Sequence, residues 1–291
     1  MTGAPVPSEQ EIALYDRFTH GEIGRRSFLQ RMTALAGSVA AAGAVIAVIR
    51  ADDSHAQTID PSRVEAETVV WTSAGRRRQS GYLARPLGGP KHSGAVLVIH
   101  ENRGLNEHIR DVSRRFAVAG YPALALDFLA PVGGTPADED AAREAIGKLD
   151  PAQSTRDAMD AIAFLGAAEK TPVAVTGFCW GGGMTLRLAV HAGGQIAAAI
   201  PFYGSAPDPA LAARVEAPVT MQLAGLDDRV NSTALPFAEA LEAAGKPVTV
   251  NLYDGVNHAF HNDTSLARYA PEAANLAWQR TLAALAEAFA I

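Results

Sequence analysis

Cysteine is almost absent from the sequence, since Cys179 is the single one among 291 residues. An intramolecular disulfide is therefore excluded, and the lone thiol raises a question of reactivity rather than of folding. Positive charge is not in excess either, because the formal net charge is −6. A chain without a basic field does not attract phosphate backbones, so nucleic acid is not an expected partner. With 48% hydrophobic residues, the chain can bury one substantial core.

The first 56 residues differ in pattern from the rest of the chain. Arg25 and Arg26 precede an uncharged stretch at residues 32–49 that is rich in alanine, glycine and valine. Ser54 and Ala56 then supply small residues of the kind that a signal peptidase reads. This order is typical of a twin-arginine export signal. We therefore predict that residues 1–56 are a signal peptide and that residues 57–291 are the catalytic domain.

The same pattern predicts where the protein goes. The twin-arginine (Tat) export machinery is the expected partner of the signal, and the product is expected in the periplasm or secreted. No stable membrane insertion is expected after signal cleavage. The alternative is a retained membrane anchor, because residues 32–49 are at the short limit for spanning about 30 Å of hydrocarbon.

From about residue 66, strand-like and helical patterns alternate along the chain. Residues 95–99 and 173–175 are continuously apolar, as strands buried on both faces of a sheet should be. The strand patterns fall at 67–71, 81–85, 95–99, 123–127, 172–176, 197–201, 218–223 and 248–253, and the helical patterns at 106–119, 138–148, 152–167, 184–191, 235–244 and 271–289. The alternation predicts an α/β domain with a mostly parallel central sheet flanked by helices. No repeat or linker divides residues 57–291, so one domain is expected.

A nucleophile motif lies at residues 173–183. An apolar strand runs directly into Gly-Phe-Cys-Trp-Gly, and a helical pattern follows. In hydrolases with Gly-x-Ser-x-Gly, the nucleophile occupies a tight strand-to-helix turn, and side chains at the two glycine positions would collide with their neighbours. The motif therefore predicts an α/β-hydrolase fold with Cys179 as nucleophile, its thiolate favoured by the helix dipole. The alternative is a small, buried and inert cysteine.

The acid and the histidine of a triad should follow the nucleophile in that order, each after a later strand. Asp227 and Asp228 follow residues 218–223, and His258 and His261 follow residues 248–253. We favour Asp227 as the acid because it is nearer the strand end, and His258 as the base because residues 255–257 lead directly into it. A metal cluster of His258, His261 and Asp263 is disfavoured because it has no second set of ligands. No metal or cofactor is expected.

The loop after residues 95–99 is expected to complete an oxyanion hole. In this fold that loop donates one backbone N–H, here from Asn102, and the residue after the nucleophile, Trp180, donates the other. Glu101 is unusual because it brings a carboxylate to the top of a buried strand beside the nucleophile. The alternative for Glu101 is an exposed glutamate paired with Arg103 or Arg110.

The chain resembles the dienelactone hydrolase (carboxymethylenebutenolidase) family over roughly residues 66–290. The resemblance rests on His-Glu-Asn-Arg-Gly at 100–104, Gly-Phe-Cys-Trp-Gly-Gly at 177–182, Gly-Leu-Asp at 225–227 and His-Ala-Phe at 258–260. It implies that Cys179 is the nucleophile, His258 the base and Asp227 the acid. It also implies that Glu101 contacts the resting thiol and moves when substrate binds. The arginine pair and the run His-Asn-Asp-Thr at 261–264 resemble an exported subgroup.

Two positions depart from the family pattern. Members that hydrolyse dienelactone hold its carboxylate with arginines, where this chain has Pro131 and Asn262. We therefore expect neutral esters or lactones to be better substrates than those that carry a carboxylate. Arg103 and His261 are candidate substrate-binding residues that could compensate.

The motifs together predict a hydrolase that cleaves small activated esters or lactones through a Cys-His-Asp triad and a thioester intermediate. Amides should be poor substrates, because a thiolate is easily expelled again when the other leaving group is poor. The alternative is a non-catalytic thiol redox sensor or binding protein on a hydrolase scaffold. The presence of Asp227 and His258 argues against a sensor, which needs no triad.

Overall fold

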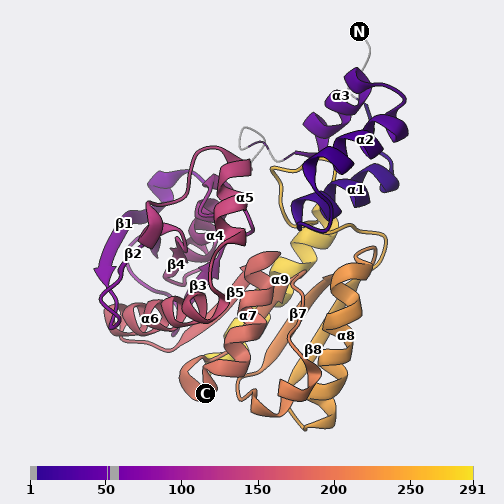
Figure 1. The fold of residues 1–291 in the computed structure, drawn as a ribbon. Helices are drawn as coiled ribbons and strands as arrows, with labels where there is room; N and C mark the ends of the chain where they lie inside the picture. The colour runs from indigo at the N-terminus through magenta and orange to yellow at the C-terminus, as the bar shows by residue number, and fades with distance from the viewer. Residues whose placement is uncertain (1–4, 51, 53–58, 291) are drawn as a thin grey trace.

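The computed structural model of the protein describes residues 5–50, 52 and 59–290. The predicted cleavage site after Ala56 lies outside these residues. The described chain contains a central sheet with helices on both faces and a group of N-terminal helices beside it (Figure 1).

The central sheet has eight strands in the order β1-β2-β4-β3-β5-β6-β7-β8. These are β1 (Val64–Thr72), β2 (Arg78–Pro86), β3 (Ala95–Ile99), β4 (Ala123–Leu126), β5 (Val173–Phe178), β6 (Ala199–Phe202), β7 (Val219–Ala224) and β8 (Val248–Tyr253). Strand β2 pairs antiparallel with β1 and β4, and all other neighbours are parallel. The predicted mostly parallel sheet of an α/β-hydrolase fold is confirmed.

Helices cover the sheet because its central strands are apolar on both sides. In β3, Leu97 and Ile99 belong to one buried core, and Val96 and Val98 belong to the other. The first core packs against α5 (Glu139–Gly147), α6 (Pro151–Glu169), α7 (Trp180–His191) and α8 (Asp228–Ala243), and the second against α4 (Glu107–Val118) and α9 (Pro271–Ala288). The alternating side chains of an extended strand thus explain its continuous apolar run.

Residues 5–50 contain helices α1 (Glu9–Thr19), α2 (Arg25–Ala36) and α3 (Val39–Ile49), here called the N-terminal unit. Helix α1 begins at a capping box in which Ser8 and Glu11 bond each other's backbone N–H. The unit has a small core of its own, built around Phe18, Phe28 and Met32. Figure 1 shows it beside the long loop that precedes α9.

Helices α2 and α3 include the arginine pair and the apolar stretch of the predicted export signal. Among the described residues, no single helix has the length and hydropathy needed to cross a membrane. Taken together, α2 and α3 reach that level of hydropathy, but they meet at a bend of 105°.

Candidate active site

Cys179 lies on a sharp turn between β5 and α7. Its φ of 55° and ψ of −113° are outside the regions that residues with side chains normally occupy. Such strain persists only where the surroundings impose it, and it is typical of functional sites. The turn places the thiol at the N-terminus of α7, where the helix dipole favours a negative charge.

The glycines of the motif are required by the packing of this turn. A Cβ atom at Gly177 would lie 2.2 Å from the backbone oxygen of Gly181, and one at Gly181 would lie 2.4 Å from that of Ile99. Both contacts are with backbone atoms, which cannot rotate away. The structure therefore has the tight strand-to-helix turn that the sequence predicts.

His258 and Asp227 meet at the same end of the sheet. Nδ1 of His258 lies 2.5 Å from Oδ2 of Asp227, and both side chains are buried. Oδ1 of Asp227 accepts a hydrogen bond from the backbone N–H of Val230 and so caps α8. Asp228 is the exposed first residue of that helix. Of the two candidate acids, the structure brings Asp227 to the histidine.

The other ring nitrogen of His258 is directed at the nucleophile. Within the described chain, the buried Nε2 of His258 has no hydrogen-bond partner. One ring nitrogen each of His20 and His258 and Sγ of Cys179 all lie within 4.8 Å of one another. Because a carboxylate only accepts, the proton of the neutral His258 ring is on Nδ1, and Nε2 is left free to accept one.

The charges around the thiol favour its ionised form. Burial opposes ionisation, but His20 and His258 outweigh it and lower the pKa of Cys179 to about 5. Burial also disfavours an imidazolium at His258, but Asp227 and Cys179 outweigh it and raise the pKa of His258 to about 10. Thiolate and imidazolium thus stabilise each other, as they do in cysteine hydrolases with a paired histidine.

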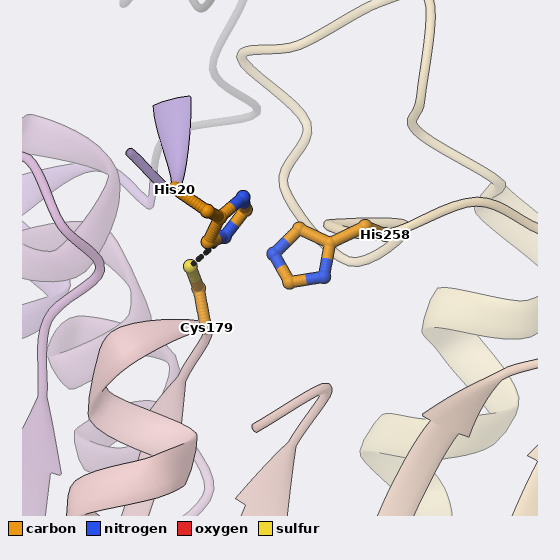
Figure 2. A group of neighbouring side chains, drawn as sticks. All are labelled: His20, Cys179 and His258. Carbon is orange, nitrogen blue, oxygen red and sulfur yellow. Dashed lines mark hydrogen bonds between the residues drawn. The ribbon is translucent and has the colours of Figure 1, made fainter. Parts of the chain in front are cut away.

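His20 is the site residue that the sequence did not indicate. It follows α1, and its Nε2 lies 3.2 Å from Sγ of Cys179, while its ring meets that of His258 edge to face at 4.7 Å (Figure 2). The sequence interpretation placed His20 inside a signal peptide. The one available signal was the Ser8-x-x-Glu11 capping box, which predicts a helix but not its contact with residue 179.

Glu101 lies in the loop after β3 and is 4% exposed. Its Oε2 accepts a hydrogen bond of 2.7 Å from Nδ2 of Asn262, and its Oε1 accepts one of 3.4 Å from the Tyr203 hydroxyl. Burial opposes its charge, but His108 and Arg103 outweigh burial and lower the pKa of Glu101. Glu101 is therefore an ionised, buried carboxylate, while the hydrogen bond to the thiol comes from His20.

The two candidate substrate-binding residues, Arg103 and His261, are buried and contact other parts of the chain. Arg103 is buried, donates to the Tyr15 hydroxyl at 2.8 Å and forms an ion pair of 3.3 Å with Glu139. His261 is 2% exposed and packs against Phe178 and Phe202. Its burial lowers its pKa well below the usual value. Neither residue lines the main cavity at Cys179.

That cavity has a volume of about 700 Å³ and reaches the thiol. Its walls include Trp180 and Asn102, the two proposed oxyanion donors. They also carry four cationic side chains and one carboxylate, namely Arg143, Lys148, Arg187, Arg229 and Glu144. The sequence analysis did not predict these cations, because they do not lie at positions 131 and 262. Arg143 lies in α5 and Lys148 at its end, Arg187 lies in α7, and Arg229 lies in α8.

The structure does not group His258, His261 and Asp263, the metal cluster considered from the sequence. Asp263 is bonded to His108 and Arg115 instead of joining His258 and His261. Within the described residues, the group that could ligate a metal is His20, Cys179 and His258.

The chain is similar to known proteins of one family. The model of the dienelactone hydrolase family matches residues 80–289. A candidate carboxymethylenebutenolidase of Methylorubrum extorquens is 35% identical over 217 residues, which cover 68% of this chain and 73% of that protein. Protein usf of Aquifex pyrophilus is 35% identical over 219 residues, covering 70% of this chain and 90% of that one.

A solved structure has the same fold. The crystal structure of a candidate dienelactone hydrolase from Klebsiella pneumoniae superposes with a TM-score of 0.67 at 29% identity, covering 77% of this chain and 99% of that one. The match to the family model begins after β1, so the N-terminal unit and His20 lie outside it. These matches show that the chain belongs to the dienelactone hydrolase family and is a hydrolase of lactones or esters.

Proposed function

We propose that the protein hydrolyses activated esters or lactones with a triad of Cys179, His258 and Asp227 through a thioester intermediate. One observation carries the proposal. The strained Cys179 faces the unpartnered Nε2 of His258, whose other nitrogen is bound to Asp227. This is the nucleophile, base and orienting acid that acyl transfer needs.

The chemistry follows from these positions. The Cys179 thiolate attacks the substrate carbonyl, and the backbone N–H groups of Trp180 and Asn102 hold the oxyanion. When the intermediate collapses, the carbon–oxygen bond breaks and the His258 imidazolium gives its proton to the leaving alkoxide. A water molecule then attacks the thioester while His258 takes a proton from it. The carbon–sulfur bond breaks, the acid is released, and Cys179 returns as thiolate.

The cationic side chains of the cavity walls favour a substrate that carries a carboxylate. Arg187 donates through Nε to the Thr155 hydroxyl at 2.8 Å and forms no ion pair with any described residue. An unpaired guanidinium on a cavity wall suits a carboxylate through charge-assisted hydrogen bonds. We therefore propose that Arg187 takes the part that the arginines missing at 131 and 262 play in the family.

A thiol sensor is less well supported. A sensor requires an accessible thiol of low pKa, but it does not require the Asp227–His258 pair or the glycine-dependent turn. The pKa of Cys179 alone would suit either protein, and the ordered acid and histidine favour the hydrolase.

Hydrolysis of p-nitrophenyl acetate and of a simple aryl lactone tests the proposal. Cys179→Ala is expected to lower kcat/KM by about a thousandfold or more, since the remaining site supplies only binding and the oxyanion hole. Rapid quenching followed by intact-mass measurement should show a covalent acyl group on Cys179. Full turnover by Cys179→Ala, or an acyl group on another residue, would overturn the mechanism.

A further inference from the structure

His20 is held so that one particular nitrogen faces the thiol. Its Nδ1 lies 2.6 Å from the backbone oxygen of Asp16, and its Nε2 lies 3.2 Å from Sγ of Cys179. A carbonyl oxygen only accepts, so Nδ1 carries a proton. In the neutral ring Nε2 is therefore free to accept the thiol proton, and in the charged ring it donates to the thiolate.

The end of α1 that precedes His20 is hydrogen-bonded to three side chains of the catalytic domain. Nδ2 of Asn102 donates to the backbone oxygen of Thr19 at 2.9 Å. The Arg268 guanidinium donates to Oδ1 of Asp16 at 2.8 Å. Arg103, which is 6% exposed, donates to the hydroxyl of Tyr15. Three successive contacts on one face of α1 thus fix the position of the residue that follows it.

Further contacts join the remainder of the N-terminal unit to the domain. The Ser265 hydroxyl donates to the backbone oxygen at the end of α3, at 2.9 Å. Arg50 forms an ion pair of 3.1 Å with Glu139, and Arg143 lies 4.5 Å above the ring of Phe18. Thr19, His20 and Gly21 form part of the wall of the cavity at Cys179. The unit therefore shapes the site.

We propose that His20 is a second catalytic histidine, which ionises the Cys179 thiol from an N-terminal unit that is part of the working enzyme. The inference rests on the proposed function of Cys179 as nucleophile. In the step, one proton moves from Sγ to Nε2 of His20 and leaves a thiolate and an imidazolium. No other bond forms or breaks. His258 is already protonated near neutral pH, since its pKa is about 10. It therefore gives its own proton to the leaving group and afterwards takes one from water.

Other charged or titratable groups also face the thiol and must be considered in its titration. They are Glu101 and Arg103 after β3, Tyr203 after β6, Asp227 and Arg229 at the start of α8, and His258 and Arg268 in the loop after β8. His20, in contrast, is hydrogen-bonded directly to Sγ, at 3.2 Å from its Nε2. Removing this imidazole should therefore change ionisation of the thiol more than removing a charge that acts at a distance.

A catalytic role of His20 is incompatible with the predicted removal of residues 1–56. Cleavage after Ala56 would take His20 and the whole N-terminal unit away from the thiol. The intact mass of the exported enzyme is therefore one arm of the test. A mass that includes residue 20 is expected, and an active enzyme that begins after residue 56 would overturn the proposal.

The second arm measures thiol ionisation directly in the full-length protein. The rate of Cys179 alkylation by iodoacetamide is followed by intact mass from pH 4 to pH 9.5 in the wild type, His20→Ala and His20→Gln. Both variants should raise the apparent thiol pKa by at least about one unit. Alkylation at pH 5 should therefore slow by about fivefold or more, while the rate at pH 9.5 should return to the wild-type plateau. His92→Ala, which removes an exposed histidine far from the cavity, is the matched control.

Each result has a distinct meaning. Superimposable pH profiles for wild type and His20→Ala would overturn the role of His20. Faster alkylation at every pH without a shift would also overturn it, because His20 would then only shield the thiol. Thermal unfolding of each variant shows whether it is folded, and His20→Gln keeps the side-chain volume if His20→Ala is not. Alkylation does not depend on ester turnover. Failure of the proposed hydrolase activity is therefore recognised separately, by comparing ester hydrolysis by the wild type and by Cys179→Ala.

Discussion

The carboxylate of Asp227 performs two tasks at once, since Oδ2 lies 2.5 Å from Nδ1 of His258 while Oδ1 caps helix α8. The helix fixes the carboxylate, and the carboxylate fixes the tautomer and the direction of the histidine ring. The position of the proposed base therefore depends on where α8 begins.

Asp227→Asn is expected to lower kcat by several orders of magnitude, about 10⁴-fold by analogy with other triads, because the amide stabilises the wrong tautomer of His258. Asparagine is still a good N-cap, so the melting temperature should change little. Steady-state kinetics and thermal unfolding of Asp227→Asn and the matched control Asp228→Asn check both statements. If Asp228→Asn were the more damaging change, the assignment of the acid would be wrong.

The pH dependence of ester hydrolysis should be broad. The thiolate is the reactive form, so kcat/KM should rise with pH through the Cys179 pKa of about 5 and then reach a plateau. It should fall only as His258 loses its proton near its pKa of about 10. Initial rates between pH 4 and pH 9.5 test this. A rate that keeps rising tenfold per unit between pH 7 and pH 9 would indicate an ordinary thiol instead.

Arg187→Gln should weaken selection for a substrate carboxylate. Loss of a charge-assisted contact costs about 1.5–3 kcal/mol, so kcat/KM for a lactone bearing a free carboxylate should fall by more than about tenfold. Its methyl ester should be nearly unaffected, and Arg187→Lys should retain part of the preference. A wild-type preference for the methyl ester would favour the expectation from Pro131 and Asn262 over that from the cavity walls.

Glu101→Gln removes a buried negative charge from the vicinity of the thiol. That charge opposes a second negative charge at Cys179, so its removal should lower the thiol pKa and speed iodoacetamide alkylation near pH 5. Ester turnover can fall at the same time, because Asn262 and Tyr203 lose their acceptor. Glu107→Gln, in the exposed first turn of α4, serves as control. Identical alkylation profiles would show that Glu101 does not influence the thiol.

The arginine pair can be tested independently of the chemistry. Arg25 and Arg26 open α2 and are exposed, so they remain accessible while the chain is folded. Replacing both with lysine should leave the protein in the cytoplasm if the twin-arginine machinery recognises them. Immunoblots of cell fractions give the distribution, with Arg31→Lys as control. Unchanged export of the double variant would contradict the prediction.

The parts predicted well were those that local pattern determines. The apolar run at 95–99 is β3, and the glycines around Cys179 form the turn that their spacing indicates. The order of Asp227 and His258 after later strands was also sufficient to bring them together, because parallel strands end at one edge of the sheet. The antiparallel pairing of β2 with β4 was not predicted, since period and composition do not specify a strand's neighbours.

The parts that were not predicted depend on contacts between distant segments. His261 was expected to face substrate, but its ring packs between Phe178 and Phe202 because the chain turns again after residue 258. His20 and Cys179 are 159 residues apart, and no spacing rule relates them. An arginine pair before an apolar stretch indicates export equally well whether or not the segment also folds against the domain.

The distance along the chain between the partners of the N-terminal unit has a consequence for its assembly. Asp16 pairs with Arg268, which is 252 residues away. Synthesis runs from the N-terminus, so α1 leaves the ribosome long before its anchoring residues exist. Closing so long a loop is entropically costly until the intervening domain has folded and brought the ends together. Docking of α1, and with it the arrival of His20 at the thiol, is therefore among the last events in folding, and a truncated chain never acquires it.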